Sequence, residues 1–222
     1  MTEILLIRHG ETAWNAIRRL QGHLDIPLSE EGLRQAALLG QVLRDEPLDA
    51  IFSSDLHRAY QTAQAVALPR GMPVQVDRGL RERCYGAFEG MLYADIGARY
   101  PEAYRAWQAR EIDYRFPEGV HVAETLREFS GRTVDAIVRI ATAKPYRRIA
   151  LVAHGGVLEC AYRAAQGLGF DHARDFDILN ASINRFVLEQ GRLKMVQWGD
   201  IAHLEAGESL ALDEIDRAAA DR

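Results

Sequence analysis

Short, continuously apolar runs alternate along the chain with longer segments in which apolar residues recur every three or four positions. The runs at residues 4–7 and 149–153 are apolar throughout, which is typical of strands buried on both faces of a sheet. Shorter strands are predicted at residues 50–52 and 73–76. The four runs together indicate a sheet that is largely covered by other elements.

Helical spacing fills the segments between these strands. Ser29 is predicted to cap a helix that two acidic residues open and Pro47 stops, and Asp55 to cap the next one. A long helix is expected over residues 126–141, and a further helix from Val157. A helix is thus predicted after each of the strands at 4–7, 50–52 and 149–153.

Because strand and helix patterns alternate, we expect an α/β fold, specifically a three-layer α/β/α sandwich with a mostly parallel central sheet. Gln190-Gly191 lies between the apolar segments 183–188 and 193–196, which predicts an antiparallel hairpin late in the chain.

No linker or repeat divides the chain, so a single domain over residues 1–222 is expected. A charged and aromatic stretch at about 91–122 is predicted to form a helical insertion. Beyond Leu204 the composition favours a surface helix, a frayed end or an interface element.

Composition narrows the classes of function. The 222 residues are 48% hydrophobic and 27% charged with a net charge of −5, which is ordinary for a globular protein. Nucleic-acid binding is not expected because no basic stripe is present, nor is a membrane span, because no apolar run approaches about 18 residues. The N-terminus carries no basic leader, so a cytoplasmic protein is expected. Cys84 and Cys160 are expected to be reduced thiols. A zinc site would need more ligands at close spacing, so no metal site is expected.

Two histidines follow the two main strands. Arg8-His9-Gly10 comes directly after the first, and His154-Gly155-Gly156 directly after the strand that ends at residue 153. Since the carboxyl ends of parallel strands meet at one edge of a sheet, both imidazoles are expected at the same site. Glycine lets backbone N–H groups approach a ligand, and a helix N-terminus attracts anions, so Gly155 is expected to contact a phosphate.

Further polar residues complete the chemistry of a phosphate site. Arg58 follows the second strand, and guanidinium groups bind phosphate bidentately without losing their charge. A neutral imidazole such as that of His9 can attack phosphorus, and a carboxylic acid must then protonate the leaving oxygen. Glu82 is the first choice for this acid, with Glu89 and Glu11 as alternatives.

With these residues in place, the chain resembles the histidine phosphatase superfamily, which includes the cofactor-dependent phosphoglycerate mutases. The resemblance covers most of the chain and rests on five ordered motifs. These motifs are Arg8-His9-Gly10-Glu11-Thr12 with Asn15, residues 22–29, residues 53–63, Leu80-Arg81-Glu82 with Gly86 and Glu89-Gly90, and Ala153-His154-Gly155-Gly156.

The resemblance implies a role for each matching residue. His9 would become phosphorylated, and Arg8, Arg58 and His154 would clamp the phosphate. Glu82 would serve as general acid and then as general base. The residues implied on the substrate side are Asn15, Thr12, Gln21 and Gly22. The family needs no metal ion for this chemistry, the partner would be a small phosphorylated metabolite, and a homodimer is compatible with the fold.

The acceptor of the phosphoryl group divides the family. In the mutases the acid motif continues Glu-Arg-His-Tyr-Gly and is followed by an Arg pair and a Lys, whereas here Cys84 replaces the His. No Arg pair and no Lys occur between Gly90 and Lys144, and residues 87–90 are more similar to the phosphatases. The phosphatase segment Pro-x-Gly-Glu-Ser appears only in a loose form at 117–125. Hydrolysis of a small phosphomonoester is therefore favoured, with a mutase dependent on 2,3-bisphosphoglycerate as the alternative.

A different class is an inactive module that binds a phosphorylated ligand on the same fold. The presence of His9, Arg58, Glu82 and His154 together argues against it.

Overall fold

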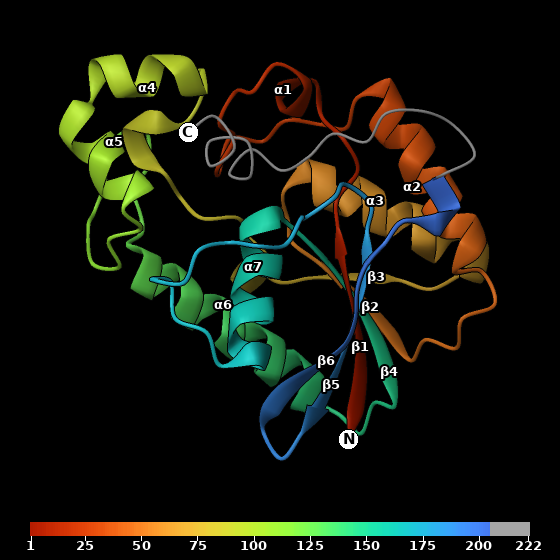
Figure 1. The fold of residues 1–222 in the computed structure, drawn as a ribbon. Coiled ribbons are helices and arrows are strands. Elements are labelled where there is room, and N and C mark those ends of the chain that lie inside the picture. The colour runs from red at the N-terminus through yellow and green to blue at the C-terminus, as the bar shows by residue number, and fades with distance from the viewer. Residues whose placement is uncertain (205–222) are drawn as a thin grey trace.

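Six strands form one central sheet in the order β3-β2-β4-β1-β5-β6 in the computed structural model, which describes residues 1–204 (Figure 1). The strands are β1 Thr2–Arg8, β2 Ala50–Ser53, β3 Val74–Val76, β4 Arg148–Ala153, β5 Ile183–Glu189 and β6 Arg192–Asp200. β1 to β4 run parallel, whereas β5 and β6 are antiparallel to their neighbours. The predicted α/β fold with a mostly parallel sheet and a late hairpin is confirmed.

Two layers of helices cover the sheet. Figure 1 shows α2 and α3 on one face and α6 and α7 on the other. These helices span Glu30–Val42, His57–Ala67, Leu126–Thr142 and Gly155–Gln166, respectively. Side chains of β1 and β4 alternate between the two layers: Leu5 and Ile7 pack with α2 and α3, while Ile4 and Leu6 pack with α6 and α7. Burial on both faces explains why these strands are apolar at every position.

The central strands set the place of the functional loops. β1 pairs with β4 in parallel register from Glu3 opposite Arg148 to Arg8 opposite Ala153. Both strands therefore end side by side, and the chain leaves each of them at a histidine.

The predicted helix starts are partly confirmed. The Ser29 side chain accepts a hydrogen bond from Gly32 N and caps α2, as expected. The prediction that Asp55 caps α3 is wrong, because α3 begins after Leu56 without a side-chain cap and Asp55 pairs with Arg81 instead.

Two predicted helix boundaries are displaced. α2 ends at Val42, before Pro47, and α7 begins at Gly155 rather than Val157. The hairpin turn is confirmed: Gln190 and Gly191 have φ values of 51° and 76°, as a two-residue hairpin turn requires.

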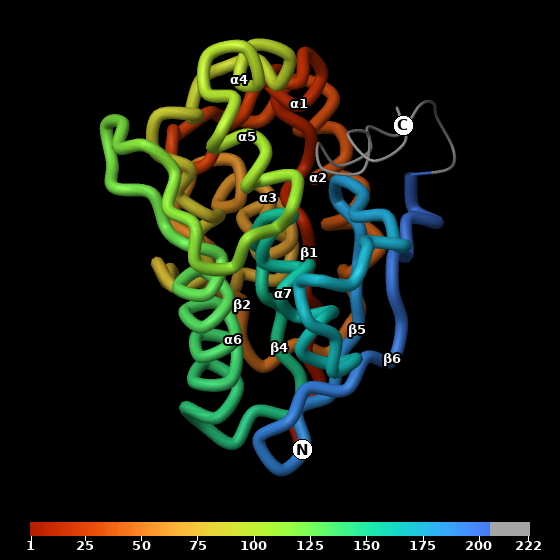
Figure 2. Tube along the Cα trace, turned by 60° about the vertical axis from the view of Figure 1, so that its left-hand side comes forward, coloured from red at the N-terminus to blue at the C-terminus, as the bar shows by residue number. Residues whose placement is uncertain are grey.

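Three short helices gather beyond the carboxyl end of β1, on the side opposite the N-terminus (Figures 1 and 2). They are α1 Ala13–Ala16, α4 Tyr93–Arg99 and α5 Pro101–Gln108. An apolar cluster that includes Ile96 from α4, together with Phe88 and Phe116, packs these helices against neighbouring segments of the chain. None of the helices within residues 1–204 has the length and apolar character needed to cross a membrane. The predicted C-terminal tail beyond Leu204 falls outside the described residues.

Candidate active site

His9 and His154 meet at the shared end of β1 and β4. Their ring centroids are 5.1 Å apart with an interplanar angle of 61°. His9 N donates a hydrogen bond to Ala153 O at 3.0 Å, which ties the first residue after β1 to the last residue of β4. Both side chains are buried, with 3% and 0% of their surfaces exposed.

The contacts of His9 fix which ring nitrogen can react. Nδ1 lies 2.7 Å from Gly10 O, a carbonyl that can only accept, so Nδ1 carries the proton and Nε2 keeps its lone pair. Burial, followed by the charges of Arg58 and Arg8, holds the pKa of His9 well below its ordinary value of 6.5. The imidazole is therefore neutral at pH 7, as a nucleophile must be.

Two buried arginines stand beside this ring. Arg8 donates to Ile178 O at 2.6 Å, and Arg58 donates to Leu24 O at 3.0 Å and to Gly22 O at 2.8 Å. Backbone carbonyls thus orient both guanidinium groups without neutralising their charge. A dianionic phosphate is suited to such a place.

His154 is more enclosed than His9. It precedes α7 as the N-cap residue, and neither of its ring nitrogens has a hydrogen-bond partner among residues 1–204. Burial, then Arg58 and His9, lowers its pKa well below 6.5. Two neutral imidazoles can therefore lie in contact without charge repulsion.

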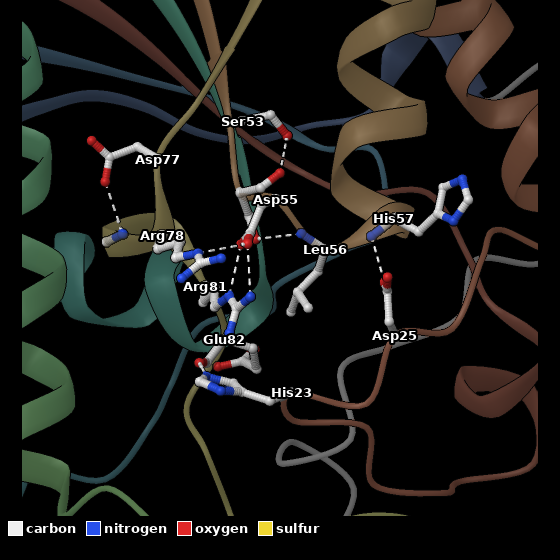
Figure 3. Close-up of polar contacts among 12 residues, drawn as sticks. His23, Asp25, Ser53, Asp55, Leu56, His57, Asp77, Arg78, Arg81 and Glu82 are labelled. Atoms are coloured by element: carbon white, nitrogen blue, oxygen red, sulfur yellow. Dashed lines mark hydrogen bonds and ion pairs between the residues drawn. The ribbon is translucent and has the colours of Figure 1, made fainter. Parts of the chain in front are cut away.

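Glu82 is held against the same site by two backbone N–H groups. Its Oε2 accepts from Gly156 N at 3.0 Å, and its Oε1 accepts from Arg83 N at 2.7 Å. Figure 3 shows the loop around it: Arg81 forms a two-pronged ion pair with Asp55 at the end of β2, and His23 approaches the Glu82 carbonyl.

The two alternative acids occupy other places. The Glu89 Oε1 accepts from His23 N at 2.9 Å and from Tyr85 N at 3.0 Å, so this carboxylate joins two loops. Glu11 accepts from Ser29 Oγ at 3.3 Å beside α2. Neither lines the cavity described next, whereas Glu82 does.

A cavity of about 30 Å³ lies between these groups. The residues predicted from sequence that line it are Arg8, His9, Asn15, Gln21, Gly22, Arg58, Glu82 and Gly155. Thr12 and His154 do not line it. Thr12 is fully buried and donates to Asn15 Oδ1 at 3.0 Å and to Gln21 Oε1 at 3.1 Å, so it holds two lining side chains rather than facing a ligand.

Sequence reasoning missed four lining residues, namely Leu20, Tyr85, Tyr93 and Gly156. Gly156 stands in a motif that was recognised, and Tyr85 lies three residues after Glu82. Tyr93 opens α4, and no local pattern connects it to the site.

Within residues 1–204, one group of side chains could hold a metal ion. The ligand atoms of Cys84, Glu89 and His121 lie within 4.8 Å of one another. Burial raises the pKa of the Cys84 thiol to about 11, so the sulfur is protonated in the protein as it stands. Cys84 and Glu89 flank the short helical turn at Gly86–Phe88, whereas His121 comes from a later loop, and their spacing in sequence did not indicate this group.

Comparisons with known proteins agree with this arrangement. The family profile described as "Histidine phosphatase superfamily (branch 1)" matches residues 4–201. An Arabidopsis thaliana protein named "Phosphoglycerate mutase-like protein 4" is 40% identical over 207 residues, which cover 91% of this chain and 87% of that protein. The "Metal-independent phosphoserine phosphatase" of the same plant is 35% identical over 209 residues, covering 93% and 84%.

Solved structures give the same result. Bacillus stearothermophilus YhfR has a TM-score of 0.84 at 31% identity, covering 92% of this chain and 100% of that one. A mutant phosphoserine phosphatase from Entamoeba histolytica, in complex with phosphoserine, has a TM-score of 0.80 at 25% identity, with the same two coverages of 92% and 100%. The chain belongs to the histidine phosphatase superfamily and is an enzyme of that family, a phosphatase or a mutase.

Proposed function

We propose that the protein hydrolyses a small phosphomonoester through a phosphohistidine formed on Nε2 of His9. The observation that carries the proposal is the arrangement of one neutral imidazole, two backbone-anchored guanidinium groups and one carboxyl group around a single cavity of about 30 Å³. A cavity of this size admits the phosphoryl group but not the rest of the substrate, which stays outside.

The first half-reaction forms the covalent intermediate. The lone pair on His9 Nε2 attacks phosphorus, the bond from phosphorus to the ester oxygen breaks, and Glu82 gives its proton to that oxygen. Arg8 and Arg58 stabilise the charge on the transferring oxygens. Asn15 from α1 and Gln21 from the loop after it line the same cavity and would contact the same group.

The second half-reaction restores the enzyme. A water molecule gives a proton to the Glu82 carboxylate and attacks phosphorus, the phosphorus–nitrogen bond breaks, and inorganic phosphate leaves. His9 returns to the neutral form with its Nδ1–H donated to Gly10 O. No metal ion or organic cofactor enters this reaction, and the similarity to the "Metal-independent phosphoserine phosphatase" of Arabidopsis thaliana supports that.

Water rather than a second substrate hydroxyl is the proposed acceptor, on the strength of Cys84 and of the insertion that lacks an Arg pair. Solved neighbours include phosphoserine and glucosyl-3-phosphoglycerate phosphatases. The mutase remains the second candidate because proteins named "Probable phosphoglycerate mutase GpmB" from Yersinia pestis are 34% identical over 98% of this chain.

Replacement of the nucleophile tests the proposal. His9→Ala should abolish both hydrolysis of 4-nitrophenyl phosphate and acid-labile labelling by a ³²P ester, while His57→Ala, at an exposed position, should retain both. Full hydrolysis by the His9→Ala protein would refute the mechanism. Conversion of 3-phosphoglycerate to 2-phosphoglycerate that depends on 2,3-bisphosphoglycerate, at a rate above hydrolysis, would favour the mutase.

Three further expectations stand as proposals beside this function. They are a single domain with an insertion at about 91–122, a cytoplasmic location and a homodimer. Light scattering after size-exclusion chromatography measures the last directly.

A further inference from the structure

A second, much larger cavity of about 380 Å³ adjoins the phosphate cavity. The two share Tyr85, Tyr93 and Gly156 as a common wall. Gly156 N also binds the Glu82 carboxylate, the group proposed to protonate the leaving oxygen. The Glu82 carboxylate therefore lies next to the wall that the two cavities share.

Apolar and aromatic side chains form most of its surface. Tyr104 and Trp107 come from α5, Phe116 from the loop that follows, and Phe129 from α6. A volume of about 380 Å³ falls in the range of sites for drug-sized ligands, roughly 300–1,000 Å³. A compact leaving group such as serine or glycerate would leave most of these aromatic surfaces uncovered.

One buried guanidinium in this wall, that of Arg83, forms no ion pair with any residue in 1–204. Arg83 is 5% exposed and lies over the ring of Phe116 at 4.5 Å, and its Nε donates to Glu124 O at 3.0 Å. Its Nη2 has no hydrogen-bond partner among residues 1–204, and no described ion pair includes this residue. A buried guanidinium with an unused donor is costly, and an anionic ligand group would remove that cost.

The other charges around the cavity are already committed or exposed. Glu159, buried deep in the wall, pairs with Arg163 at 2.8 Å and with Arg110. Arg174, a buried arginine that also lines the cavity, forms an ion pair with the same carboxylate at 3.7 Å. Glu111 and Asp171 also line the cavity, but both are exposed to solvent. Arg83 is thus the cation available for a ligand held against the aromatic wall.

We propose that the substrate is a phosphomonoester whose leaving group combines an apolar, ring-sized body with a second anionic group that pairs with Arg83. This inference rests on the proposed function of the site, because it places the leaving group relative to a phosphoryl group bound at His9. It assigns the insertion helix α5 to substrate selection.

Three esters of alkyl alcohols test it: ethyl phosphate, 2-phenylethyl phosphate and 2-(4-carboxyphenyl)ethyl phosphate. Their leaving oxygens are all alkoxides of similar basicity, so differences in kcat/KM report on binding of the remainder. We expect a gain of about tenfold or more from ethyl to phenylethyl. A further gain of about tenfold is expected from the carboxylate.

Variants separate the two parts of the proposal. Arg83→Gln should remove the gain from the carboxylate and retain the gain from the phenyl group, while Arg105→Gln, at an exposed position of α5, should leave both gains as they are. Ala109→Trp, which adds a side chain at the cavity rim, should reduce the phenyl gain towards one. If Arg83→Gln does not fold, Ala109→Trp still tests whether the larger cavity holds the leaving group.

The outcomes also separate this inference from the function beneath it. Equal kcat/KM for all three esters, or a carboxylate gain that survives in Arg83→Gln, overturns the substrate class while the phosphatase stands. No turnover of any ester, 4-nitrophenyl phosphate included, overturns both.

Discussion

The Glu82 carboxylate and the backbone N–H of Gly156 are joined by a hydrogen bond of 3.0 Å. Gly156 follows the motif histidine His154 by two residues, so the proposed acid is fixed to the first turn of α7, directly after β4. Two residues 74 positions apart in sequence are thereby joined, and the bond holds the carboxylate beside the cavity that His9 lines.

Gly156→Ala should displace the acid without unfolding the protein. A Cβ at this position would stand 2.3 Å from Glu82 Oε1, the end of a flexible side chain that can move, and 3.0 Å from the ring of Phe129, which would have to shift by a few tenths of an ångström. Turnover of alkyl phosphates should fall by about 10-fold or more, since catalysis by a positioned acid contributes about 10²–10⁴. Gly131→Ala, a helical position with open space around it, serves as the control in the same kinetic assay and should retain the rate.

Glu82→Gln should distinguish substrates by their leaving groups. Alkyl phosphates need a proton on the leaving oxygen and should lose about 10²-fold or more in kcat, whereas 4-nitrophenyl phosphate should lose far less. Glu118→Gln, at an exposed position, should change neither rate. Equal losses of kcat for both ester types would show that another carboxylate acts as the acid.

Asp55→Asn should weaken catalysis more than stability. The Asp55 carboxylate takes two hydrogen bonds of 2.7 Å from Arg81, next to Glu82 (Figure 3). Both side chains are partly exposed, so the pair is expected to contribute at most about 1 kcal/mol to the free energy of unfolding.

Loosening this loop should lower kcat for alkyl phosphates several-fold, with KM nearly constant. Asp113→Asn breaks an equally two-pronged but fully exposed pair with Arg127 and is the matched control. If both variants lose the same activity, the Asp55 pair has no special role in placing Glu82.

The buried histidines predict how stability depends on pH. The pKa values of His9 and His154 lie well below 6.5 in the folded protein, so below that pH the unfolded chain binds protons that the folded chain does not. The free energy of unfolding therefore falls as pH falls from about 6.5, by up to about 1.4 kcal/mol per pH unit for each histidine. Urea unfolding between about pH 5 and pH 7.5 measures this slope.

His154→Asn should make the slope shallower by the share of one histidine, while His57→Asn should leave it unchanged. An identical slope in His154→Asn and the original protein would show that this imidazole is not held neutral by the fold.

The sequence alone determined the elements whose causes are local. Continuous apolar runs identified β1 and β4, Ser29 marked the start of α2, and Gln190-Gly191 marked the hairpin turn. Each of these elements depends on contacts within a few residues or on the burial of a whole segment. Both causes leave a recognisable pattern in the amino-acid sequence. The positions of His9 and His154 at the strand ends followed from the same patterns.

Only the tertiary structure decided which groups share a cavity. The sequence favours Glu82 as the acid but leaves Glu89 and Glu11 as alternatives, and of these three packing brings only Glu82 to the cavity that His9 lines. Asp55 has the pattern of a helix cap, but Arg81 from a distant turn takes its carboxylate.

The larger cavity, too, was decided only by the tertiary structure, and the sequence indicated it even less. Arg83, Trp107 and Phe129 come from a turn and two helices, and nothing in their own neighbourhoods connects them. Helix capping and strand burial are short-range effects that neighbouring residues encode. The walls of a cavity depend on how separate elements pack, and that is fixed only when the whole chain is folded.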